Sequence, residues 1–98
     1  MSTQEATAIW NGSLKEGNGS FSLPKAGYTG DFSFATRFEN ADGTNPEELV
    51  GAAIASCYSM FLSALLTNNG FENKHIDTRS TVTLDRDDTG PVITDISL

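Results

Sequence analysis

The sequence contains one long stretch, from Leu49 to Leu66, that carries no charged residue. A segment of this length and composition forms either a membrane-spanning helix or a helix that is buried in a protein core. The stretch contains three serines, and no Lys or Arg flanks it to anchor its ends at a membrane surface. We therefore predict a buried helix and no membrane insertion.

Signals at both ends define this helix. Asn45 is a good N-cap, Pro46 suits the first helical position, and acidic residues follow in the first turn. We expect the helix to span residues 46–69, with Gly70 ending it. A helix that is apolar on nearly every side needs a second helix as well as a sheet to cover it. The sequence offers no second helix, so we predict either a homodimer or a further segment of the fold.

Segments with strand-like alternation lie on both sides of the helix. Before it, residues 6–14 and 20–23 are expected to form a hairpin, with 24–30 as a loop. Residues 32–38 alternate an aromatic face with a face that carries Arg37, which predicts a further strand. After the helix, two strands are expected at residues 81–85 and 92–98. Residues 85–91, which include several acidic side chains, are expected to form the turn between them.

The order of hairpin, strand, long helix and hairpin predicts an α+β fold. We expect antiparallel hairpins packed on a long central apolar helix. The length suits a single domain covering residues 1–98.

Composition excludes several classes of function. Six basic residues face thirteen acidic ones, for a net charge of −7, and the basic residues are scattered, so no nucleic-acid partner is expected. The N-terminus lacks a basic region followed by an apolar one, which predicts a cytoplasmic protein. One cysteine and one histidine are too few for a disulfide framework or a zinc site, so we expect no metal and no cofactor.

Cys57 is either a packing residue or a reactive thiol, and free cysteines are among the most buried residues. A reactive thiol needs a nearby cation, because the thiolate is the nucleophile and Cys57 lies too far into the helix to use its dipole. Arg37 is the best candidate, although an arginine on a sheet face is more often simply solvated. Glu47 and Glu48 are explained by the helix dipole, and His75 is expected at the surface without a role.

Three consecutive blocks of sequence carry a resemblance to a known family. The blocks TRFE, GTNPEELVGAA and ASCYSM, at residues 36–39, 43–53 and 55–60, resemble the core motifs of the OsmC and organic-hydroperoxide-resistance family. Shorter segments resemble the same family in order and spacing, so that the resemblance covers nearly the whole chain: 8–12, 70–71, 76–78 and 82–85.

The resemblance implies a peroxidase that reduces organic hydroperoxides, and hydrogen peroxide, through a reactive cysteine. Cys57 corresponds to the peroxidatic cysteine, Arg37 to the cation that polarises it and Glu47 to the acid that holds the arginine. Glu48 corresponds to the neighbouring, non-catalytic position. The resemblance also implies an intertwined homodimer with the active site near the subunit interface.

The spacing of these residues restricts how they can meet. Glu47 and Cys57 are ten residues apart, or roughly 15 Å along a straight helix. One guanidinium can scarcely reach both side chains of the same chain. We therefore hypothesise that the partner subunit supplies one of the three residues.

Members of that family continue beyond the position of Leu98 with a further strand, a second helix and a resolving cysteine. The chain is thus expected to represent the N-terminal portion of the family fold, as a fragment, a truncated product or a short homologue. Without a second thiol, turnover needs an external thiol reductant. The alternative prediction is a truncated, non-catalytic dimeric protein in which Cys57 is a packing residue.

Overall fold

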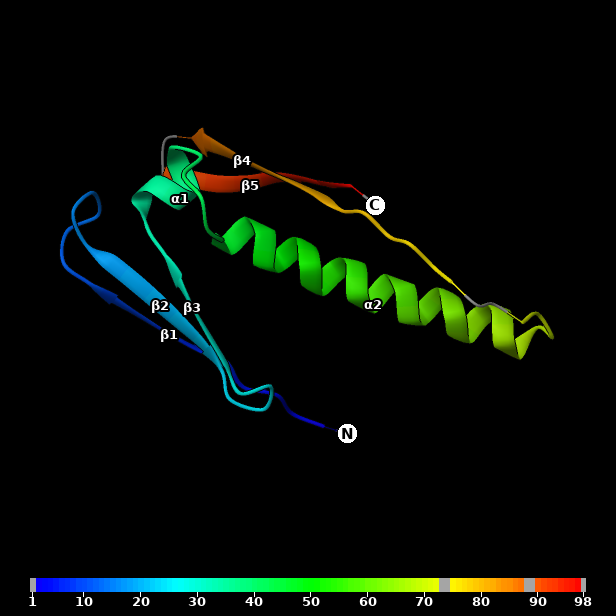
Figure 1. The fold of residues 1–98 in the computed structure, drawn as a ribbon. Coiled ribbons are helices and arrows are strands. Elements are labelled where there is room, and N and C mark those ends of the chain that lie inside the picture. The colour runs from blue at the N-terminus through cyan, green and yellow to red at the C-terminus, as the bar shows by residue number, and fades with distance from the viewer. Residues whose placement is uncertain (1, 73–74, 88–89, 98) are drawn as a thin grey trace. The chain divides into compact units, whose positions relative to one another are not determined.

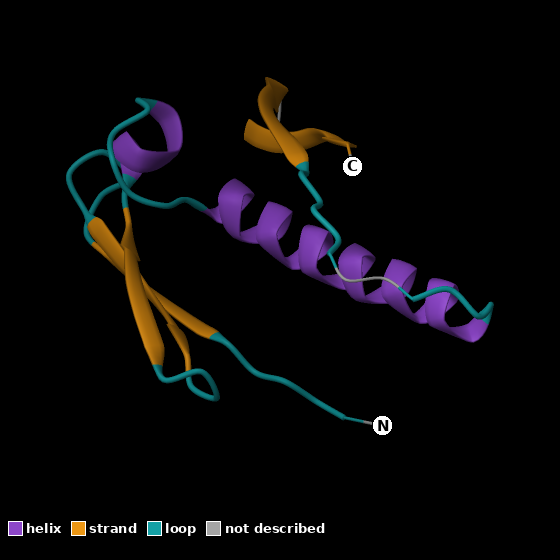
Figure 2. Ribbon diagram, turned by 45° about the vertical axis from the view of Figure 1, so that its right-hand side comes forward, coloured by secondary structure: helices purple, strands orange, loops and turns teal. Residues whose placement is uncertain are grey.

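The structure is a computed structural model that describes residues 2–72, 75–87 and 90–97. The described chain forms two compact units, Met1–Pro46 and Glu47–Leu98. The first unit contains a three-stranded sheet and a short helix, and the second contains a long helix and a two-stranded sheet (Figures 1 and 2). This composition confirms the predicted α+β class.

The first unit begins with an antiparallel sheet in the order β1-β2-β3. Its strands are β1 (Thr7–Asn11), β2 (Asn18–Leu23) and β3 (Tyr28–Phe32). The predicted first hairpin is confirmed, with Thr7 opposite Ser22 and Asn11 opposite Asn18, although β1 ends at Asn11 and not at Leu14 as predicted. The tight loop of this hairpin requires a glycine at position 17, because a Cβ there would lie 2.3 Å from the Asn11 carbonyl oxygen.

Two sequence-based predictions fail in the first unit. Residues 24–30 were expected to be a loop, yet β3 begins at Tyr28 and pairs with β2 along its length. Residues 32–38 were expected to be a strand, yet Phe34–Phe38 form helix α1. Arg37 therefore lies in the last turn of a helix and not on a sheet face.

A capping box explains the helical form of α1. The Ser33 hydroxyl accepts a hydrogen bond from the Thr36 N–H at 3.2 Å, and the Thr36 hydroxyl accepts one from the Ser33 N–H at 2.9 Å. This reciprocal pair satisfies backbone donors that a helix start leaves unpaired. Asn40, in the left-handed region at φ 57°, then turns the chain so that the Ala41 N–H donates to the Ala35 carbonyl.

The second unit contains helix α2, Pro46–Asn68, as predicted. Gly70 ends it in the left-handed region at φ 81°, and the Phe71 N–H donates to the Leu66 carbonyl at 2.9 Å. These contacts satisfy carbonyl groups at the end of the helix. By length and composition α2 is a candidate membrane span, and 6% of its most apolar window is buried in the single chain.

The chain then returns along α2 toward its first turns. The Ser59 hydroxyl hydrogen-bonds Thr78 Oγ1 at 2.6 Å, and the Ser80 hydroxyl donates to the Gly51 carbonyl at 2.7 Å. Gly51 is buried, and a Cβ there would lie 2.9 Å from Ser80 Oγ. The small residue at position 51 thus lets the returning segment approach the helix backbone.

A second hairpin follows, formed by β4 (Thr81–Asp87) and β5 (Gly90–Ser97). Thr81 pairs with Ser97 and Asp87 with Gly90, with a register shift between Thr83 and Leu84. The predicted hairpin is confirmed, although its strands extend two residues further toward the turn than expected. Residues 88–89 and Leu98 lie outside the described residues.

Candidate active site

Cys57 lies in the middle of α2 and is exposed in the single chain. The segment that returns along α2 meets the helix at Gly51 and Ser59. At about 100° per residue, Cys57 lies on the opposite side of the helix from these two residues. The returning segment therefore leaves the thiol open, and Cys57 does not serve as a core residue of one chain.

The surface around Cys57 is apolar. Met60 and Phe61 follow at one-turn spacing on the same side of α2 and are 76% and 61% exposed. No charged residue occurs in this part of the helix. Any cation that acts on the thiol must therefore come from another element of the fold.

The two acids of the first turn of α2 have different environments. Glu47 is buried, with 7% of its surface exposed, whereas Glu48 is exposed. Carboxylates are rarely buried unless they are paired or hydrogen-bonded. The helix dipole alone does not require this burial, because it acts equally on an exposed acid. The structure thus separates two acids that composition alone could not distinguish.

Arg37 lies in the first unit and is half-buried at the end of α1. Its guanidinium carbon lies 5.2 Å from the centroid of the Phe38 ring, within the range of a cation–π contact. The three predicted site residues are thus divided between the units, since Glu47 and Cys57 share α2. His75, for which no role was expected, is exposed as predicted.

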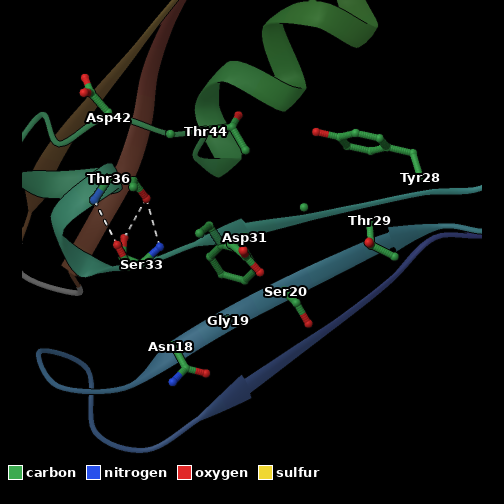
Figure 3. A pocket seen from close by; sticks show the side chains of 13 residues that line it. Asn18, Gly19, Ser20, Tyr28, Thr29, Asp31, Ser33, Thr36, Asp42 and Thr44 are labelled. Atoms are coloured by element: carbon green, nitrogen blue, oxygen red, sulfur yellow. Dashed lines mark hydrogen bonds between the residues drawn. The ribbon is translucent and has the colours of Figure 1, made fainter.

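The described residues of the first unit line two hollows of different size. The larger has a volume of about 930 Å³ and a lining that is about half polar, with hydroxyl groups and two carboxylates along β2, β3 and the loop before α2 (Figure 3). It contains Ser20, Tyr28, Thr29, Asp31 and Asp42 but no thiol and no basic side chain among its described lining residues. Its size alone therefore does not make it the active site.

The smaller hollow, of about 220 Å³, is lined by Arg37. Its other lining residues come from β1, its loop, β3, α1 and the start of α2: Trp10, Leu14, Phe32, Ser33, Phe34, Phe38 and Pro46. None of these side chains was predicted from the sequence to form part of a site. The spacing of Phe34 and Phe38, whose ring centroids are 4.9 Å apart, is the helical signal that could have revealed them.

The order of these residues along the chain resembles that of known proteins. Residues 39–98 match the profile of the family described as OsmC-like protein. The chain is 45% identical over 96 residues to Peroxiredoxin OsmC of Escherichia coli strain K12 and to Peroxiredoxin OsmC of Shigella flexneri. Each match covers 97% of this chain and 67% of the relative. The chain therefore belongs to the OsmC-like protein family.

Proposed function

We propose that this chain is a thiol-dependent peroxidase in which Cys57 reduces organic hydroperoxides. The exposure of Cys57 on an apolar helix surface is the structural observation that carries the proposal. The name of the relatives, Peroxiredoxin OsmC, supports the same reaction class. The alternative of a non-catalytic protein required Cys57 to be a packing residue, and its exposure in the single chain does not favour that role.

In the proposed reaction the Cys57 thiolate attacks the terminal oxygen of the hydroperoxide. An S–O bond forms as the O–O bond breaks, so that the sulfur is oxidised to a sulfenic acid and the peroxide is reduced. The departing alkoxide takes up a proton and leaves as an alcohol. An external thiol then condenses with the sulfenic acid, releasing water, and a second thiol restores Cys57.

Arg37 and Glu47 are proposed to support this step. A guanidinium stays charged at any working pH, so it can stabilise both the thiolate and the alkoxide that develops from the peroxide. Glu47 is proposed to hold the guanidinium through a charge-assisted hydrogen bond. Burial of Glu47, in contrast to its exposed neighbour Glu48, supports the choice between the two acids.

We also propose that the protein acts as a soluble, cytoplasmic homodimer. A second copy would cover the apolar side chains of Met60 and Phe61, which one chain leaves exposed, and would leave the peroxide a path to Cys57. Membrane insertion is disfavoured because residues 75–80 form a non-helical segment and hydrogen-bond α2 through side chains. Such backbone exposed to lipid would lack partners for its N–H and C=O groups.

The reaction is tested by mixing the protein with one equivalent of tert-butyl hydroperoxide and following the loss of the Cys57 thiol. Mass spectrometry is expected to find one oxygen added at Cys57. Arg37→Ala is expected to slow the oxidation about 10- to 100-fold, the value of a lost hydrogen bond to a charged group. Arg79→Ala, which removes an exposed arginine outside the proposed site, is the control.

An inert Cys57 would contradict the peroxidase proposal. Equal rates for the Arg37→Ala and Arg79→Ala variants would remove Arg37 from the mechanism while leaving Cys57 as the reactive residue.

A further inference from the structure

The side chain of Asn45 forms a hydrogen bond that its place before α2 does not predict. Its Nδ2 group donates to the Thr36 carbonyl of α1 at 3.2 Å, and both residues are half-buried. An N-cap side chain acts through its oxygen, so the amide nitrogen of Asn45 is available for a second element. That second element is the helix that carries Arg37, and Thr36 is the residue directly before it.

The loop between Thr36 and Asn45 has the conformation that this contact requires. Asn40 at φ 57° and Gly43 at φ 128° both lie in the left-handed half of backbone space, which lets the chain turn back toward α1. Gly43 passes so close to α1 that a Cβ there would lie 3.0 Å from Thr36 Cγ2. A side chain at position 43 would therefore push the loop away from the carbonyl that Asn45 reaches.

Helix α1 depends on contacts of this kind. It has five residues, too few for a stable isolated helix, because starting a helix costs more than one turn of hydrogen bonds returns. The capping box of Ser33 and Thr36 satisfies donors at its start (Figure 3). The Asn45 amide satisfies a carbonyl in its last turn, where a helix leaves acceptors unpaired. Together these contacts hold the turn that carries Arg37.

We infer that Asn45 is a positioning residue that acts through Arg37. Its hydrogen bond to Thr36 keeps the last turn of α1 in one conformation, so that the guanidinium is preorganised for the thiolate and the developing alkoxide. Without this bond, α1 loosens and fewer molecules hold the guanidinium in place. The inference rests on the proposed function, because it takes Arg37 as the cation that acts on Cys57.

Asn45→Ser tests this role. Serine keeps an N-cap oxygen for α2 but is too short to reach the Thr36 carbonyl. We expect it to slow Cys57 oxidation by tert-butyl hydroperoxide about 3- to 10-fold, the effect of one lost hydrogen bond. Asn45→Asp, which has the right length but cannot donate when ionised, is expected to act in the same direction.

Asn69→Ser is the matched control. Asn69 lies directly after α2, and its Nδ2 group donates to the Leu65 carbonyl at 2.8 Å. The substitution removes a hydrogen bond of the same kind from a position outside the proposed site. We expect it to leave the rate of Cys57 oxidation unchanged.

Two further measurements separate the positioning of Arg37 from a general loss of structure. In an Arg37→Ala background, Asn45→Ser is expected to slow Cys57 oxidation no further, because both changes act through one guanidinium. In the presence of Arg37, the NMR signal of its Nε–H group is expected to shift in Asn45→Ser and not in Asn69→Ser. This signal can be measured without any reaction.

The outcomes distinguish this inference from the proposed function. If Asn45→Ser slows Cys57 oxidation equally with and without Arg37, Asn45 acts by another route and the inference is wrong. It is also wrong if Asn45→Ser changes neither the rate nor the Arg37 signal, and the peroxidase then stands. If Cys57 of the wild type is inert, the peroxidase proposal fails, whereas a shift of the Arg37 signal in Asn45→Ser alone supports Asn45 as the residue that positions the guanidinium.

Discussion

The two helices that carry the proposed site residues are specified in different ways. Helix α1 is five residues long, and the hydrogen bonds at its ends decide that it is a helix. Helix α2 is 23 residues long, and its apolar composition together with its end signals specifies it. A long helix repeats its signal over many turns, whereas a short one has little besides its caps. The position of Arg37 therefore depends on few contacts, and that of Cys57 on many.

The largest effect is expected if Arg37 in α1 of one chain acts on Cys57 in α2 of another. Arg37→Ala and Cys57→Ala chains, each expected to have little activity alone, are unfolded, mixed in equal amounts and refolded together. If the site is shared between subunits, half of the dimers contain one intact site of two, and about a quarter of wild-type activity returns. Peroxide consumption with an excess of thiol measures it.

The double variant carrying both substitutions, mixed with wild type, controls for subunit exchange. Activity no higher than that of the parent variants would place Arg37 and Cys57 of one active site in the same chain.

A smaller effect is expected where α2 meets the segment that returns along it. Gly51→Leu adds a side chain whose Cβ alone would lie 2.9 Å from Ser80 Oγ and 3.5 Å from Val82 Cγ2. Overpacking of this kind typically costs about 1–3 kcal/mol. Chemical denaturation is expected to show that loss, whereas Ala52→Leu, at an exposed position on the next residue, is expected to change stability little. Equal losses would mean that the segment does not pack against α2 at position 51.

The smallest effect is expected at the cap of α1. Ser33→Ala removes the side chain that accepts from the Thr36 N–H and is expected to cost about 1 kcal/mol. Ser33→Asp keeps an N-cap acceptor and is expected to recover most of that loss. Thermal unfolding measures both variants. If Ser33→Ala leaves the unfolding temperature unchanged, the capping hydrogen bonds do not hold α1 in its helical form.

The features that could be predicted from the sequence are those whose pattern extends over many residues. The structure confirms α2, which Pro46 and Gly70 delimit, both hairpins and the α+β class. The comparisons confirm the family. The predictions failed at residues 28–32 and 34–38. The aromatic alternation of Phe34, Thr36 and Phe38 fits a strand, yet Phe34 and Phe38 are also one helical turn apart.

The candidate site likewise contains residues that could be predicted from the sequence and residues that could not. Cys57 and the Asn-Pro-Glu motif that contains Glu47 are recognisable from order and spacing, and their roles stay predictions. The aromatic hollow around Arg37 was not recognisable, because its walls come from β1, its loop, β3 and α1. Side chains that are distant in sequence form a hollow only when the backbone brings them together.

By itself the sequence determined that the chain contains a long apolar helix with one cysteine at its middle and two acids at its start. Composition and the signals at the helix ends suffice for this, because a helix is held by hydrogen bonds between residues that are close in sequence. Only the tertiary structure decided that Glu47 is buried and Glu48 exposed, that Cys57 is open and that Arg37 lines an aromatic hollow. Burial and cavities depend on which segments pack together, and that packing is set by contacts between residues far apart in the chain.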